Sequence, residues 1–390
     1  MVAFIYVLLL YNKKAFMVTV IEAVSKKQKK LFATFPINLY KDNKYYVPSL
    51  VGDEMALDDP KKNLYKGSSE IKCFLAYKDN KLVGRIAAII NHESNNKHNE
   101  SCIRFSRIDF IDDMEVSKAL IDAVIAWGKE RGLKEIHGPW GFNDADREGM
   151  LSFGYDEYST YATAYSYPYY IKHMEALGFV KESEWQEFRF MLTNIDPRYF
   201  KAGEMVRKQN KYHDVCRDMP FKKIVKKYGD SFFECYNRAY SMLDNFIPLV
   251  EEAKEATLKQ FATIINSKFC SIITDNKTDK VVAFSIVLPY IGDVLRKAKG
   301  RMLFAALPLL HTIKHPKKLE LALLGVDPDY RNSGAHALIF TSFYENCDKY
   351  KIQDIVVDPI LTTNVNMNNS WQWMNKELRA KRQTFRKEIK

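Results

Sequence analysis

The chain has 390 residues, of which 47% are hydrophobic and 27% charged. This is the composition of a globular protein long enough for two domains, and it excludes a disordered or fibrous chain. The formal net charge of +11 favours an anionic partner: a phosphorylated cofactor, an acidic carrier protein, a membrane surface or nucleic acid. The six cysteines lie far apart with no CxxC pair, which argues against a zinc site and a disulfide framework and favours a reducing cytoplasm.

The first residues contain an apolar run, residues 2–11, that is too short to span a bilayer and lacks the basic leader of a secretory signal. Met17 then opens a segment that alternates like a first strand. We therefore expect residues 1–16 to be an artefact of start-site choice, with a weak membrane anchor as the alternative.

The first half reads as strands and helices in a definite order. Its hydrophobic periodicity and turn residues predict a strand at 18–24, a helix at 26–40, a hairpin at 73–90 turning at Asp79-Asn80, a strand at 102–110, a helix at 112–133, a strand at 134–140, a helix at 167–179 and a strand at 185–192.

The second half repeats this order without repeating the sequence. The same signals predict helices at 221–245 and 251–265, a hairpin at 269–289, a strand at 318–326, a helix at 334–351, a strand at 352–359, a helix at 368–378 and a strand at 382–389. This is an architectural repeat, and it predicts one domain at 17–196 and a second at 197–390.

Several motifs carry a family resemblance: "KDNKLVGRIAAIINH", "GPWGFNDADREGML" and "LALLGVDPDYRNSGAHALIF". They resemble the GNAT superfamily of acyl-CoA N-acyltransferases, in particular the bacterial proteins that carry two such domains in tandem. The resemblance implies an α/β fold with a mixed sheet in each domain. It also implies acetyl-CoA or a longer acyl-CoA as co-substrate, with the phosphopantetheine of an acyl carrier as the alternative donor, and a small-molecule or lipid amine as acceptor.

The stretch "GVDPDYRNSGAH", residues 325–336, lies between an apolar strand and a helix. A helix that opens here aims unpaired backbone amides and its positive dipole end at one point, which suits a pyrophosphate. Arg331 would add charge, and Gly334 would permit close approach of the ligand. Asn332, Ser333 and Ala335 fit the family pattern, whereas His336 stands where the family has a small residue.

The resemblance implies further cofactor contacts on the neighbouring strand and beyond it. A backbone amide of the strand segment from Leu324 to Val326 would polarise the thioester carbonyl. Asn364 matches an asparagine that contacts the cofactor arm, although Thr362 replaces the usual glutamate beside it.

The corresponding corner of the first half, "IDDME", is acidic and has no glycine, so its carboxylates would repel a pyrophosphate. We therefore expect the first domain to be free of cofactor. Its loop at 138–151 brings together polar residues that either bind the acceptor amine or form a salt-bridged seam between the domains. These residues are Asn143, Asp144, Asp146, Arg147 and Glu148.

The resemblance also implies Glu320, on the strand before the pyrophosphate loop, as the candidate for the general base that removes a proton from the amine. The alternative is a solvated carboxylate on an alternating strand. No cysteine lies in a predicted site loop, so we expect direct transfer without an acyl-enzyme. The histidines are scattered, so neither a hydrolytic triad nor a metal site is predicted.

Residues 289–318 form an insertion in which basic residues flank the apolar stretch "MLFAALPLLHTI". This segment could cover an acyl chain, make peripheral contact with an anionic membrane, or pack as a helical hairpin. Two other functions compete with acyl transfer to an amine. One is a Fem-like aminoacyl transferase that uses tRNA. Such enzymes normally carry a long coiled-coil arm, and the sequence has no sustained heptads, which disfavours this function and a nucleic-acid partner. The other is a non-catalytic acyl-CoA-binding protein, favoured by His336, Thr362 and the absence of the tyrosine that protonates the leaving group in the family.

Overall fold

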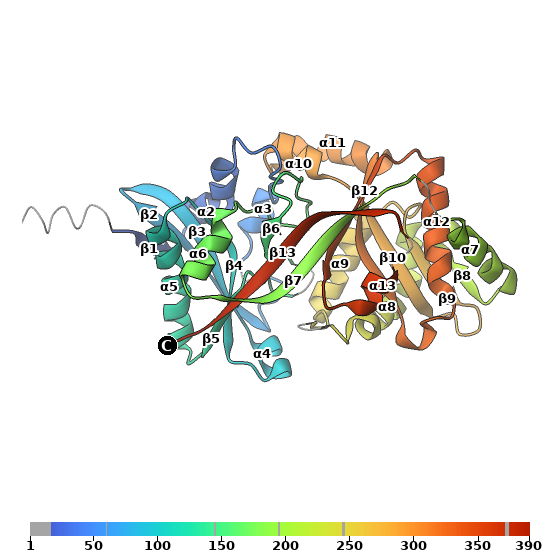
Figure 1. Cartoon of the computed structure of the whole chain (residues 1–390), viewed down its shortest axis with the longest axis horizontal. Coiled ribbons are helices and arrows are strands. Elements are labelled where there is room, and N and C mark those ends of the chain that lie inside the picture. The colour runs from blue at the N-terminus through green and yellow to red at the C-terminus, as the bar shows by residue number, and fades with distance from the viewer. Residues whose placement is uncertain (1–16, 60, 144–145, 194–195, 244–245, 371–373) are drawn as a thin grey trace, which may run out of the picture.

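The computed structural model describes residues 17–390 except 60, 144–145, 194–195, 244–245 and 371–373 (Figure 1). The interpretation of residues 1–16 and the assignment of Asp144 therefore lie outside the described residues. The first half comprises β1 (Thr19–Glu22), α2 (Lys26–Leu39), α3 (Val51–Glu54), β2 (Ser69–Lys78), β3 (Lys81–Asn91), α4 (His92–His98), β4 (Cys102–Phe110), α5 (Met114–Glu130), β5 (Glu135–Gly138), β6 (Met150–Phe153), α6 (Tyr169–Ala176) and β7 (Val180–Phe190).

The second half follows a similar order. It comprises α7 (Pro197–Gln209), β8 (Tyr212–Asp214), α8 (Phe221–Tyr240), α9 (Glu251–Ile264), β9 (Ser271–Asp275), β10 (Val281–Pro289), α10 (Gly292–Ala298), α11 (Met302–Lys314), β11 (Lys318–Val326), α12 (Ala335–Lys349), β12 (Asp354–Leu361), α13 (Val365–Ser370) and β13 (Lys376–Glu388).

One mixed sheet runs through both halves, in the order β1-β2-β3-β4-β5-β13-β7-β12-β11-β10-β9-β8, and β6 pairs with β13. Strands β4 and β5 are parallel in the first half, as β11 and β12 are in the second. The expected α/β architecture with a mixed sheet is confirmed.

The two halves share their central strands. β13, the last strand of the chain, lies between β5 and β7, and β7 in turn pairs with β12. Figure 1 shows β7 and β13 as two long strands that cross from one half to the other. Each half therefore completes its sheet with a strand from the other.

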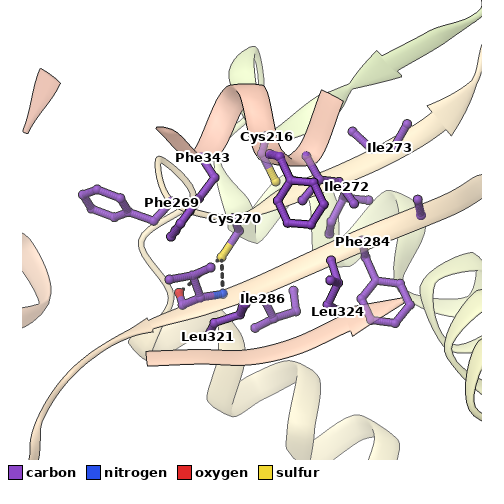
Figure 2. Packing of buried hydrophobic residues seen from close by; sticks show 14 of the residues in the cluster. Cys216, Phe269, Cys270, Ile272, Ile273, Phe284, Ile286, Leu321, Leu324 and Phe343 are labelled. Carbon is purple, nitrogen blue, oxygen red and sulfur yellow. Dashed lines mark hydrogen bonds between the residues drawn. The ribbon is translucent and has the colours of Figure 1, made fainter. Parts of the chain in front are cut away.

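The core of the second half packs between the sheet and its covering helices. Figure 2 shows Phe284 and Ile286 of β10 beside Leu321 and Leu324 of β11, with Phe343 of α12 nearby. Cys270 lies in this core, where its Sγ donates a hydrogen bond to the Val287 carbonyl (3.4 Å) and accepts one from the Val287 amide (3.3 Å).

Both predicted hairpins are confirmed. Asp79 and Asn80 turn the first with φ of 51° and 60°, left-handed values that asparagine and aspartate tolerate. The predicted helix at 368–378 is wrong over its second part, because β13 begins at Lys376. There Lys376 pairs with Phe190 and Leu378 with Phe188, so sheet pairing overrides local helical periodicity.

A buried ion cluster holds the shared strands together. Glu187 of β7 accepts from Arg379 Nη1 at 2.6 Å and from Arg382 Nε at 2.5 Å, and all three side chains are buried. The two guanidinium groups also donate to the carbonyls of Tyr158 and Ala164 in the first half. The cluster thus ties β7 to β13 and ties both to a first-half loop.

Replacing Glu187 with alanine should lower the free energy of unfolding by about 3–5 kcal/mol, because the two buried guanidinium groups lose the carboxylate they share and Arg379 keeps only a 3.6 Å ion pair with Glu157. Glu184→Ala is the matched control. Glu184 lies on the same strand but pairs with Lys181 and Lys381 near the surface, so its loss should cost less than about 1 kcal/mol. Urea denaturation measures both, and equal losses would contradict a central role for Glu187.

Candidate functional site

A cavity of about 890 Å³ opens where β11 and β12 separate. The two strands pair only between residues 318–321 and 354–357, although β11 continues to Val326 and β12 to Leu361. Residues beyond the paired segment line the cavity from both strands: Ala322, Leu324, Gly325 and Val326 from β11, and Asp358, Pro359, Ile360 and Leu361 from β12.

The N-terminus of α12 lies at this cavity. Gly334 is its N-cap with φ of 91°, and no side chain caps it. In the described chain, the amides of Gly334 and His336 have no hydrogen-bond partner. Arg331, Asn332 and His336 line the cavity beside them. Free amides, the helix dipole and a guanidinium are features that favour an anion.

Most of the predicted cofactor residues come together here. Six of the nine line the cavity: Leu324, Val326, Arg331, Asn332, His336 and Asn364. The other three, Ser333, Gly334 and Ala335, support the turn. Ser333 Oγ accepts from the Ala335 amide at 3.4 Å, and Ala335 is buried.

The expected role of Gly334 needs correction. A Cβ on this residue would lie 2.7 Å from Val206 Cγ2 on α7, so the missing side chain makes room for that helix and not for a ligand. The positive φ independently favours glycine. His336 departs from the expected small residue, and desolvation lowers the pKa of its imidazole.

Glu320 lies on β11, next to Leu321, which lines the cavity. It is only 2% exposed, so the alternative interpretation as a solvated carboxylate is wrong. Thr160 and Ala162 of the first half and Asp358 of β12 lie close enough to its carboxyl group to influence its pKa. Glu320 does not line the cavity; Asp358, at the bulge of β12, does.

Glu320 and Asp358 form a coupled carboxyl pair. Burial raises the pKa of Glu320, although its polar neighbours act against this, and burial together with the Glu320 charge raises that of Asp358 well above its ordinary value. Because two adjoining carboxylates repel each other, the charge of Glu320 favours the protonated form of Asp358. Asp358 Oδ1 has no hydrogen-bond partner in the described residues.

The polar loop of the first half divides its residues between two environments. Asp146 binds Arg107 through two hydrogen bonds of 2.8 Å, and Arg147 donates to the Tyr161 carbonyl and to Ser49 Oγ. Asn143 is buried and donates to the Tyr65 hydroxyl. Glu148 instead lines the cavity, together with Trp140 and Trp185.

The equivalent positions of the first half are filled by the protein itself. Asp113 caps α5, accepting from the Glu115 amide at 2.9 Å, and Lys78 contacts both carboxylates at 2.6 and 2.9 Å. Where β4 runs beyond β5, the Trp140 amide donates to the Phe105 carbonyl, and the Phe105 ring packs against Gly138. The N-terminus of α5 is thus occupied by the carboxylates of Asp113 and Glu115 and by the ammonium group of Lys78.

All six cysteines are free and buried, and none of them lines the cavity. Burial raises the pKa of the Cys73, Cys102, Cys235 and Cys270 thiols to about 12. These thiols are therefore not the reactive thiolates that covalent catalysis requires. No group of three or more His, Cys, Asp or Glu side chains that could hold a metal occurs among the described residues.

Solved structures with the same arrangement identify the fold. A tandem GNAT protein from the clavulanic acid biosynthesis pathway aligns with 96% of this chain and 99% of its own, with a TM-score of 0.58 and 9% identity. The chain has the tandem GNAT fold. A GCN5-related glucosamine N-acetyltransferase region of a fungal multi-domain β-N-acetylglucosaminidase aligns with 95% of the chain and 38% of its own, with a TM-score of 0.56 and 10% identity.

Two curated proteins are similar in sequence to this chain. Protein YghO of Escherichia coli K12 is 25% identical over 381 residues, which cover 94% of each chain. The bacterial ceramide synthase of Caulobacter vibrioides is 23% identical over 323 residues, covering 81% of this chain and 82% of its own. No family model matches the sequence.

Asp358→Asn should flatten the pH dependence of stability. A carboxyl group whose pKa is raised by folding contributes stability below its unfolded pKa, and that contribution is lost as the pH rises through the folded value. The uncharged amide removes this loss, so the free energy of unfolding should fall less between pH 5 and 9 than in the wild type. Asp348→Asn, at an exposed position at the end of α12, should keep the wild-type slope. A wild-type slope in Asp358→Asn would show that the pair holds no extra proton.

Proposed function

We propose that this protein is an N-acyltransferase that moves an acyl group from acyl-CoA directly to an amine. The observation that carries the proposal is the cavity at the separation of β11 and β12, which ends at the uncapped N-terminus of α12. An anion site and a slot between two strand edges suit a donor with a pyrophosphate at one end and a thioester arm at the other.

Different residues of the site would contact the two ends of the donor. The amides of Gly334 and His336, with Arg331, would hold the pyrophosphate. The strand edges and Asn364 would line the arm, and acetyl-CoA or a longer acyl-CoA would place its thioester near Asp358. The lining of the cavity includes apolar side chains from α8 and the segment after it, Tyr240, Met242, Leu243 and Phe246, which suits an acyl chain longer than acetyl.

The carboxyl pair supplies the proton transfers that the reaction needs. The amine nitrogen attacks the thioester carbonyl carbon and the carbon–sulfur bond breaks, releasing the thiolate of coenzyme A. The pair, which begins with one proton, accepts a second from the attacking amine and passes one to the departing thiolate. Asp358 faces the cavity, so it is the member that would exchange protons with the reactants, while Glu320 sets its charge state.

We further propose a lipid amine as the acceptor. The support is the relative described as a ceramide synthase, since a ceramide joins an acyl group to a long-chain amine through an amide bond. The apolar lining of the cavity agrees with such a substrate. The competing functions, aminoacyl transfer from tRNA and non-catalytic binding of acyl-CoA, are decided by the same experiments.

Binding of the donor is tested by thermal unfolding with acetyl-CoA, long-chain acyl-CoA, free coenzyme A and aminoacyl-tRNA. A donor at about 100 times its Kd should raise Tm by a few degrees. Arg331→Glu should weaken binding at least about tenfold, because it puts a carboxylate beside the pyrophosphate. Lys277→Glu makes the same change of charge on the exposed hairpin turn of the same half and should bind as the wild type does.

Arg331 is a better probe than Gly334, whose substitution would disturb the packing of α7 and lower stability by itself. If no acyl-CoA raises Tm, or if Arg331→Glu and Lys277→Glu behave alike, the donor site is wrong. A shift with aminoacyl-tRNA alone would favour the aminoacyl transferase. Donor binding without thiol release in the presence of long-chain or short amines would favour the non-catalytic protein.

A further inference from the structure

Helix α11 exposes an apolar face that no part of the described chain covers. Leu303 is 86% and Leu307 80% exposed, and Met302, Phe304 and Leu310 are also exposed. We call these five residues the outer face of α11. Leu303, Leu307 and Leu310 follow one another at helical spacing along a single stripe, whereas Ala305, on the opposite side, is buried. The surfaces of monomeric soluble proteins rarely carry so many large apolar side chains in one patch.

The outer face stands on a fixed support. α10, which precedes α11, is tied to the first half: Arg296 donates to the Lys44 carbonyl at 2.8 Å, and the Val51 amide donates to the Gly300 carbonyl at 3.0 Å. Figure 1 shows α10 and α11 side by side along one edge of the molecule. These contacts attach the segment before α11 to the first half, so the outer face is exposed on a helix that is anchored to the rest of the protein.

The charges of the segment that carries the outer face are almost all of one sign. Residues 289–318 contain seven lysines and arginines and one acid, Asp293. Asp293 is engaged by Arg296 and Lys318. In the described chain no ion pair involves the remaining five: Lys297, Lys299, Arg301, Lys314 and Lys317. Arg301 lies directly before the stripe and Lys314 at its end, so exposed cations bracket the apolar residues.

We propose that the outer face of α11 docks on the surface of an anionic lipid bilayer. The leucine stripe would enter the boundary between headgroups and acyl chains while the bracketing cations contact anionic headgroups. The 13 residues of α11 give a helix about 20 Å long, which suits lying in the interface. No helix in the described part of the chain has the length and hydropathy to cross a bilayer.

Charge decides between this partner and a second copy of the chain. A symmetric dimer through α11 would bring the exposed cations of both copies together, and like charges across an interface oppose association. An anionic surface satisfies the apolar stripe and the cations at once. The inference does not depend on the proposed reaction, since binding to lipid is measured without donor or acceptor.

Vesicle flotation tests the proposal, with phosphatidylcholine vesicles that contain or lack phosphatidylglycerol. The whole chain should float with the anionic vesicles, and less so as salt is raised. Leu303→Ser/Leu307→Ser should weaken binding at least about tenfold by removing apolar burial. Arg301→Gln/Lys314→Gln should weaken it by about tenfold or more and reduce its dependence on salt.

The matched control is Val180→Ser/Met205→Ser, which removes two exposed apolar side chains elsewhere and should leave flotation unchanged. Thermal unfolding of each variant shows that it remains folded. The proposal is overturned if the wild type does not float with anionic vesicles, or if the control loses binding as the leucine variant does. It is also overturned if sedimentation shows a dimer that Leu303→Ser/Leu307→Ser splits, because a second copy would then cover the face.

Discussion

The pairing of β7 with β13 is the constraint on which the rest of the structure depends, and Glu187 holds it. Its carboxylate is buried between Arg379 and Arg382, so the two strands are joined by charge as well as by backbone hydrogen bonds. β7 also pairs with β12, the strand that carries Asp358. The position of one member of the carboxyl pair thus follows from a strand that belongs in sequence to the other half.

This exchange lets the first half contribute to a site in the second. Thr160 and Ala162 lie near Glu320 and influence its pKa, and Glu148 and Trp140 form part of the cavity wall. The first half meanwhile closes its own helix end with Asp113 and Lys78. Two halves with a similar order of elements therefore differ at the strand-to-helix corner, which lines a cavity in the second half and is occupied by side chains of the protein in the first.

Local signals predicted much of this arrangement, while contacts between distant segments did not show in the sequence. Both hairpins and the turn before α12 depend on residues close in the chain, so turn chemistry and periodicity were sufficient. The partner of Glu320 was missed: Asp358 precedes a proline at the end of a predicted strand, and nothing local says that a bulge turns it toward β11. Val206 fills the space beside Gly334 for the same reason, since only the packing of α7 places it there.

At the start of β13 the local sequence pattern predicted a helix where the structure has a strand. The segment after Ser370 has helical periodicity, but Lys376 to Leu378 extend the ladder with β7, because a long strand shared by both halves gains pairing that a local helix cannot offer. The pattern of one segment could not reveal that its partner lies nearly two hundred residues earlier. The exchange of strands is therefore the feature that only the structure shows.

Strand β11 links the two proposed contacts of the molecule. α11 leads into its first residue, Lys318, and α12 follows its last, Val326, so the outer face and the pyrophosphate site lie at opposite ends of a strand about 30 Å long. Glu320 is the third residue of this strand, nearer to α11 than to α12. With α11 on a bilayer, the charged end of the donor would lie away from the lipid, and the carboxyl pair would lie on the side from which a lipid amine arrives. Along β11 the carboxyl pair thus lies nearer the end that would face the lipid, and the pyrophosphate site lies at the end that would face water. A membrane-held acceptor and a water-soluble donor would require this arrangement.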